Sequence, residues 1–385
     1  GNLMSTTMAD NPLLEDFTLP PFSRIRPEHV VPAIDTLLQQ NRDEIHRLLQ
    51  DVGKPDWKNL VEPIEKLDDR LNRAWSPVSH MNSVVNSDEL REAYNACLPK
   101  LSAYATEMGQ NADLYRAYKA VQESDRSLDA AQKKMLENIL RDFHLSGVDL
   151  PPAQKQRYKE ISERLSTLTS KFSENLLDAT HAWTKQITDE SELAGLPPSA
   201  LDLARQTAQQ RDMEGWLLTL EFPSYYPVMT YADNRDLRYE MYRAYSTRAS
   251  DQGPNAGEYD NSVLMDEILA LRHEAAILLG FSNYAERSLA KKMAESPQQV
   301  LDFLNDLARR SKPQAEQEFA ELETWARDKH GVDSLQAWDV AYYSEKLRQA
   351  RYNISQEELK PYFPQQMVVQ GMFDVVSRLF DVSIR

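Results

Sequence analysis

Apolar residues recur at steps of three and four throughout residues 261–303, and this spacing predicts helices. One such stripe consists of Ile268, Leu271, Ala275 and Leu278. Gly280 follows the stripe, where a helix favours a residue that tolerates positive φ. Ser296 and Pro297 then supply an N-cap oxygen and a first-turn proline, with glutamine three residues after the serine. The stretch therefore predicts a helix, a stop and a new helix.

The same spacing appears in two earlier stretches. One stripe consists of Leu60, Ile64, Leu67, Leu71 and Ala74 and is expected to end at Ser76-Pro77. A second, more regular stripe consists of Tyr158, Ile161, Leu165, Leu168, Phe172 and Leu176. A coiled-coil dimer is one interpretation of the second stripe. A seam inside a helical bundle is favoured over it, because the rhythm stops after about three heptads.

Strand-like runs occur only at 183–188 and 216–222, where large and branched residues are concentrated. We therefore predict a mainly α fold, a multi-helix domain with one small antiparallel β element. Residues 1–18 are expected to form a flexible N-terminus, and residues 19–385 one helical region. The glycine and prolines at 147–152 offer an alternative boundary within that region.

The charge balance of 44 basic and 60 acidic residues gives a net charge of −16. Such a surface argues against nucleic acid and against anionic membrane as partners. The sequence has no apolar run of transmembrane length and no signal-peptide pattern at its start. Cys97 is the one cysteine, so an internal disulfide is excluded and a reducing compartment fits. These features predict a cytoplasmic protein.

The histidines provide no local metal pair, because none has a second histidine three to five residues away. His273-Glu274 resembles the opening of the zinc motif H-E-x-x-H, but Ile277 stands where the second histidine is required. No nucleophile elbow, phosphate loop or dinucleotide fingerprint is present. We therefore predict neither a catalytic residue nor a metal ligand in this chain.

Aromatic and basic residues gather near the end of the chain, at Trp338, Tyr342, Tyr343, Lys346 and Arg348. Tyrosine offers flat area and a hydroxyl at low entropic cost, so Tyr342, Tyr343 and Lys346 are candidate substrate-binding residues. The alternative interpretation is that these residues pack in a helix core with their polar tips in solvent. This alternative is favoured, because tyrosine is commonly buried in part for packing alone.

The segment LRHEAAILLGFSNYAERSLAKKMAESPQQVLDFL closely resembles the thimet-oligopeptidase family of zinc peptidases. The likeness extends from LPPFSRIRPEHVVPAI near the start to WDVAYYSEK and LKPYFP near the end. In that family, two histidines of H-E-x-x-H and a later glutamate hold zinc, and the glutamate within the motif is the general base. This chain contains no such motif.

The resemblance implies that the chain is the N-terminal wall of a two-walled peptidase channel, whose catalytic zinc domain is missing. Zinc is then a cofactor of the parent enzyme and not of this fragment, which we expect to be inactive alone. The implied partners are short peptides and the C-terminal catalytic half of the same enzyme, with the oligomeric state left open. A stand-alone helical scaffold that binds peptides or proteins is the alternative function, and a cofactor-free enzyme is a weaker one.

Overall fold

The computed structural model describes residues 10–385, which divide into two compact units. The first unit combines residues up to Ser173 with Val263–Gln299, and the second combines Glu174–Ser262 with Val300–Arg385. The first nine residues of the N-terminal segment expected at 1–18 lie outside the described part. The prediction of a mainly helical chain with one small antiparallel element is confirmed.

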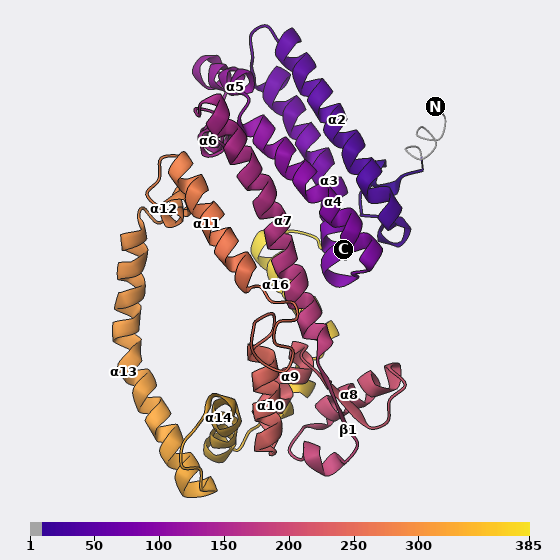
Figure 1. Cartoon of the computed structure of the whole chain (residues 1–385), viewed down its shortest axis with the longest axis vertical. Helices are drawn as coiled ribbons and strands as arrows, with labels where there is room; N and C mark the ends of the chain where they lie inside the picture. The colour runs from indigo at the N-terminus through magenta and orange to yellow at the C-terminus, as the bar shows by residue number, and fades with distance from the viewer. Residues whose placement is uncertain (1–9) are drawn as a thin grey trace. The chain divides into compact units, whose positions relative to one another are not determined.

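The first unit is entirely helical over its described residues, and Figure 1 shows α2, α3 and α4 running alongside one another. Its elements are η1 (Pro12–Leu14), η2 (Phe22–Arg24), α2 (Pro27–Asp51), the π-helical turn η3 (Trp57–Val61), α3 (Glu62–Val84), α4 (Asp88–Gly109), α5 (Ala112–Ser124), α6 (Ala130–Leu145), most of α7 (Pro152–Ala182), α11 (Ser262–Leu278) and α12 (Tyr284–Leu289). Three apolar clusters hold these helices together. Cys97 lies in one of them, where burial raises the pKa of its thiol to about 12.

The α7 stripe packs against α11 within this unit. Ile161 is buried and lies with Leu165, Leu271 and Ala275 in one apolar cluster. Two bidentate ion pairs flank the cluster, Arg157 with Glu274 and Arg164 with Glu267. In the second pair, Arg164 Nε lies 2.7 Å from Glu267 Oε1. The bundle seam predicted from the sequence thus forms between α7 and α11. These helices are separated in the chain by the part of the second unit that lies between them.

Asp68 is a titratable carboxyl group in the first unit whose pKa is raised to about 6, by burial and then by the nearby charge of Glu65. An unfolded chain ionises this group near 3.8, so the folded state loses stability as the pH rises from about 4 to 6. Asp68→Asn should therefore stabilise the protein at pH 7 by on the order of 1 kcal/mol and have little effect at pH 4. Full conversion of the shift would give about 3 kcal/mol, but Asp68 is packed on one side only and keeps much of its surface in solvent, which screens the effect.

Urea unfolding at both pH values checks the expectation for Asp68, with Glu62→Gln on the same helix as the control. Equal stabilities of the Asp68→Asn protein and the unmodified protein at pH 7 would contradict it.

The second unit contains the small sheet. β1 (Thr184–Ile187) pairs antiparallel with β2 (Trp216–Thr219), with Thr184 opposite Thr219. The remaining elements are η4 (Glu190–Leu193), α8 (Pro198–Gln210), α9 (Phe222–Tyr231), α10 (Arg235–Ser246), most of α13 (Pro297–His330), α14 (Ala337–Tyr352), α15 (Gln356–Leu359), η5 (Lys360–Tyr362) and α16 (Gln365–Phe380). All four residues of β2 are buried in the core of this unit. Across residues 10–385, no helix is long and apolar enough to cross a membrane.

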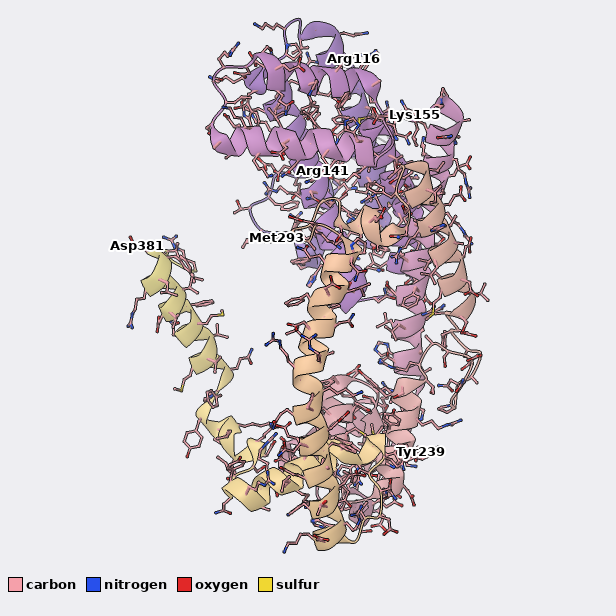
Figure 2. All side chains as sticks on the ribbon, turned by 90° about the vertical axis from the view of Figure 1, so that its left-hand side faces the viewer. Arg116, Arg141, Lys155, Tyr239, Met293 and Asp381 are labelled. Atoms are coloured by element: carbon pink, nitrogen blue, oxygen red, sulfur yellow. The ribbon has the colours of Figure 1, made fainter. Side chains whose placement is uncertain are left out.

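Helix α16 differs from the other long helices of this unit because none of its residues is buried. Figure 2 shows side chains projecting from it along its length, up to the labelled Asp381. Its apolar residues are largely exposed: Met367, Val368, Met372, Val375, Leu379 and Phe380. The first half of α13 also exposes apolar side chains, including Phe303 and Leu304. Such surfaces on a single chain commonly mark sites of interaction.

Candidate functional site

The candidate site lies where α10 and α14 begin, and the sequence sets both helix starts. Asn234 is the N-cap of α10, and its Oδ1 accepts a hydrogen bond from the backbone N–H of Leu237 at 3.2 Å. Gln336 is the N-cap of α14, and its backbone N–H donates to Oδ2 of Asp339 at 2.9 Å. Asp339 thereby occupies the first turn of α14, where a carboxylate is favoured by the helix dipole.

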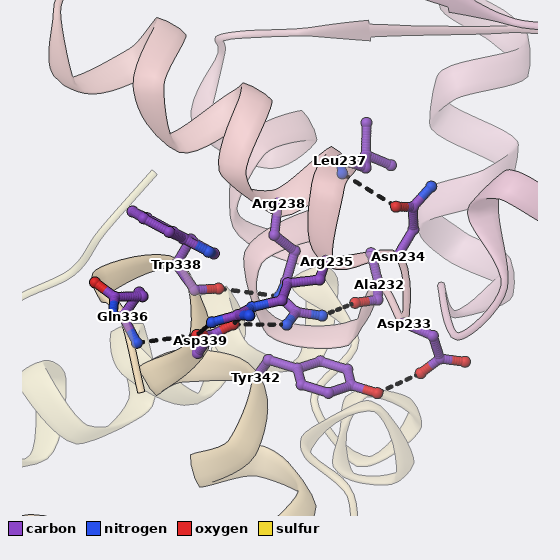
Figure 3. Close-up of polar contacts among 10 residues, drawn as sticks. All are labelled: Ala232, Asp233, Asn234, Arg235, Leu237, Arg238, Gln336, Trp338, Asp339 and Tyr342. Carbon is purple, nitrogen blue, oxygen red and sulfur yellow. Dashed lines mark hydrogen bonds and ion pairs between the residues drawn. The ribbon is translucent and has the colours of Figure 1, made fainter. Parts of the chain in front are cut away.

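Asp339 joins α14 to α10 through two arginines (Figure 3). Arg235 Nε and Nη2 donate to Oδ1 and Oδ2 of the carboxylate at 3.0 and 2.6 Å. Arg238 Nη2 donates to Oδ1 at 3.0 Å. With the N–H of Gln336, these bonds give each carboxylate oxygen two donors. The carboxylate of Asp339 therefore has no lone pair left for a proton or a water molecule, which excludes a role as a general base.

Arg238 is a buried cation of the second unit, and each of its three guanidinium nitrogens donates a hydrogen bond. Its side chain is 1% exposed and that of Asp339 is 0% exposed. The guanidinium also donates to the backbone oxygens of Trp338 at 2.9 Å and Ala232 at 2.6 Å. Burial of the two charges is tolerated because they are paired and hydrogen-bonded.

The pKa values of Asp339 and Arg235 follow this pairing. Burial alone would raise the pKa of Asp339, but hydrogen bonds from Arg235, the N–H of Gln336 and Arg238 hold it below its usual value. The carboxylate in turn raises the pKa of Arg235 through their hydrogen bonds. The ion pair is therefore present throughout the physiological pH range.

The predicted substrate-binding residues Tyr342, Tyr343 and Lys346 all lie on α14, and the first belongs directly to this cluster. The ring of Tyr342 lies 4.0 Å from the guanidinium carbon of Arg238, and its hydroxyl donates to Asp233 Oδ1 at 2.5 Å. Burial, followed by the bond to Asp233, raises the pKa of this phenol. Tyr342 is thus held neutral as a donor.

Tyr343 and Lys346 lie beside Tyr342. The ring of Tyr343 meets that of Tyr342 edge to face, with centroids 4.9 Å apart. Lys346 Nζ lies 3.8 Å from Asp233 Oδ1 and 5.4 Å from the Tyr342 ring centroid. Both tyrosines are buried, whereas the side chain of Lys346 keeps about a third of its surface exposed. Contact of the three residues with a peptide stays a prediction.

Sequence reasoning missed Arg235, Arg238 and Asp339, because the ion pairs link residues about a hundred positions apart. One local signal was present. Arg238 precedes Met241 by three residues and Tyr245 by seven, so it shares the apolar stripe of α10. An arginine on a buried stripe indicates a buried acidic partner.

The described residues do not fit a metal ion. Across residues 10–385, no three His, Cys, Asp or Glu side chains are placed to hold one. His273 lies on α11, and Ile277, one turn further along, is half exposed. No step of chemistry is therefore assigned to a metal in this chain.

Comparisons with known proteins connect the site to a family. Residues 228–385, which include the whole Arg238–Asp339 cluster, match Peptidase family M3, and residues 34–155 match the N-terminal domain of neurolysin and thimet oligopeptidase. The chain belongs to peptidase family M3. The family resemblance seen in the sequence is confirmed.

Individual M3 relatives align along almost the whole chain. The chain is 57% identical over 377 residues to oligopeptidase A of Escherichia coli and 55% identical over 374 residues to that of Haemophilus influenzae, each covering 97% of this chain. It is 40% identical over 389 residues to a probable cytosolic oligopeptidase A of Arabidopsis thaliana, covering 98% of this chain. The alignments cover 55%, 55% and 54% of these relatives, so the chain spans about half of their length.

Proposed function

We propose that this chain is the N-terminal region of a zinc-dependent oligopeptidase that hydrolyses short peptides in the cytoplasm. The observation that carries the proposal is the alignment of 97% of the chain, at 57% identity, with a protein named oligopeptidase A. In this proposal, the chain forms one wall of the substrate channel and limits entry to short peptides. Hydrolysis belongs to the additional polypeptide that the relatives possess.

The exposed apolar surfaces of the second unit support this division. A helix such as α16, with no buried residue, gains little from the unit to which it belongs. Burial of apolar area stabilises by about 25 cal/mol per Å², so a covering partner would gain from α16 and from Phe303 and Leu304 of α13. We assign that partner as the catalytic half of the same enzyme.

Tyr342, Tyr343 and Lys346 remain candidate peptide contacts in this proposal. Lys346 has the largest free surface of the three, and its ammonium group is suited to a peptide carboxylate. The buried tyrosines would then act by holding α14, and Lys346 with it, in position.

We expect the chain alone to hydrolyse no peptide and to bind no stoichiometric zinc, and the mixture with a catalytic half to hydrolyse peptides. The catalytic half used is the part of Escherichia coli oligopeptidase A that lies beyond the alignment. Hydrolysis of a quenched fluorescent peptide, zinc content and sedimentation velocity are measured for each half and for the mixture. Activity of the mixture should be abolished by a chelator and restored by zinc.

Met372→Asp with Leu379→Asp on α16 should weaken assembly of the halves, whereas Gln370→Asp on the same helix is the control. One zinc per chain in the isolated protein, or chelator-sensitive activity of the chain alone, would show that the site assignment is wrong. Failure of the halves to bind or to restore activity would instead favour the stand-alone scaffold, since such a protein needs no covering half.

A further inference from the structure

A groove of about 450 Å³ lies on the first unit, between α3 and the chain segment that precedes α2. Its apolar walls come from Phe17, Pro20 and Phe22 of the segment and from Pro77 of α3. The ring of Phe22 lies 6.0 Å from that of His80, centroid to centroid. Grooves of this size that combine aromatic walls with a few polar groups are typical ligand sites.

The segment that forms the outer wall is fixed at both ends. Leu13 of η1 is 3% exposed and belongs to the same core as α2 and α3. Further along, Arg24 Nη1 and Nη2 donate to Glu15 Oε1 and Oε2 at 3.0 and 2.7 Å. This bidentate pair closes residues 15–24 into a loop, so the aromatic wall is held against α3 before any ligand binds.

Two opposite charges on α3 face this groove without pairing. The guanidinium carbon of Arg73 lies 5.4 Å from the ring centroid of Phe17. In the part of the chain that the structure describes, no carboxylate forms an ion pair with Arg73, and no cation forms one with Asp69. An arginine stacked on an aromatic face keeps its N–H edge free for a bidentate carboxylate.

The two residues suit a ligand with an ammonium group at one end and a carboxylate at the other. Asp69 and Arg73 are four residues apart on one face of α3, which places them about 6 Å apart along the helix axis. The two charged ends of an extended dipeptide are roughly 6 to 7 Å apart, since each residue spans up to about 3.5 Å.

We propose that this groove binds dipeptides with free ends and an apolar or aromatic side chain. The ammonium group pairs with Asp69, the carboxylate pairs with Arg73, and the side chain packs between Phe17, Phe22 and His80. This inference goes beyond the proposed function, because it assigns the N-terminal bundle a binding site for small peptide products.

The test uses the whole chain and three probes: leucyl-phenylalanine, its N-acetyl derivative and its C-terminal amide. Binding is followed by NMR titration of the ligand resonances. The free dipeptide should bind about tenfold more tightly than either blocked form, since a charge-assisted hydrogen bond of this kind is worth about one order of magnitude.

Arg73→Gln should weaken binding of the free dipeptide about tenfold and remove its advantage over the amide, but leave its advantage over the N-acetyl form. Asp69→Asn should do the reverse. Arg70→Gln is the matched control, because Arg70 lies on the same helix and donates to Gln40 at 3.2 Å rather than lining the groove. Circular dichroism confirms that each variant is folded.

Three results would overturn the proposal. The first is no saturable binding of leucyl-phenylalanine at millimolar concentration. The second is equal affinity for the free and the blocked dipeptides, or for free phenylalanine. The third is a uniform loss of affinity for all three probes in Arg73→Gln, which would indicate a structural role of the arginine. None of these outcomes depends on the catalytic half, so they are distinct from failure of the proposed function.

Discussion

Asp339→Ala is expected to destabilise the second unit by about 3–5 kcal/mol. The substitution removes the only carboxylate that contacts the buried guanidinium of Arg238 among the described residues and leaves that charge with two backbone oxygens. Removing one partner of a buried ion pair has effects of this size, because the remaining charge stays in a medium of low polarity. Loss of Asp339 also frees Arg235 and the first turn of α14.

Hydrogen exchange of peptides from α10 and α14 locates the effect of Asp339→Ala, and thermal unfolding gives its size. Two units in one chain make a single unfolding transition an unsafe measure by itself. Asp328→Ala, an exposed acidic residue on α13, is the control. The double variant Asp339→Leu with Arg238→Met should recover much of the loss, because neither charge remains buried. A loss below about 1 kcal/mol in Asp339→Ala would show that the pair contributes little.

Gly195→Ala is expected to have the second large effect, a loss of about 3 kcal/mol. Gly195 has φ of +94°, and a Cβ atom there would lie 2.3 Å from the backbone oxygen of Tyr231 and 2.9 Å from Asp233 Oδ1. The side chain of Asp233 is the acceptor for the Tyr342 hydroxyl, so relief of the clash must displace that contact. Backbone strain at positive φ adds about 1–2 kcal/mol.

Gly257→Ala separates strain from the clash at Gly195. Gly257 has φ of +83°, and a Cβ atom there would have no neighbour within 4 Å. It should therefore lose about 1 kcal/mol by strain alone. Thermal unfolding of the two variants side by side provides the comparison. Equal losses of stability would mean that Tyr231 and Asp233 move aside for the new Cβ atom at no cost in free energy.

Local rules in the sequence predicted several elements well. Ser296 caps α13 as expected, with its Oγ accepting from the N–H of Gln299 at 3.1 Å, and Gly280 has a φ of +90° after α11. The strand pair forms within the predicted runs. The expected end of a helix at Ser76-Pro77 is wrong, since α3 continues to Val84 with Pro77 buried inside it. Burial of the ring offsets the hydrogen bond that proline cannot donate.

Pairing between distant elements could not be predicted in the same way. The stripe on α7 indicated that a partner helix exists, but nothing in its spacing named α11. Within the candidate site, Tyr342 stood out by its residue type, whereas Asp339 is one acidic residue among 60 and gains its meaning only from the position of Arg238. Residue type and spacing along the chain do not show which residues a hundred positions apart will form an ion pair.

The detour between α7 and α11 has a consequence for protein synthesis. The ribosome completes the apolar stripe around Ile161 and Leu165 roughly 100 residues before it reaches Leu271 and Ala275, which cover it. At a translation rate of about 5–20 residues per second, roughly 5 to 20 s pass before the residues that cover the stripe are synthesised. During this interval, the nascent first unit exposes this apolar seam while Glu174–Ser262 of the second unit emerges. A chaperone that binds apolar helix faces would find its target on α7 in this window, and slower translation would lengthen it.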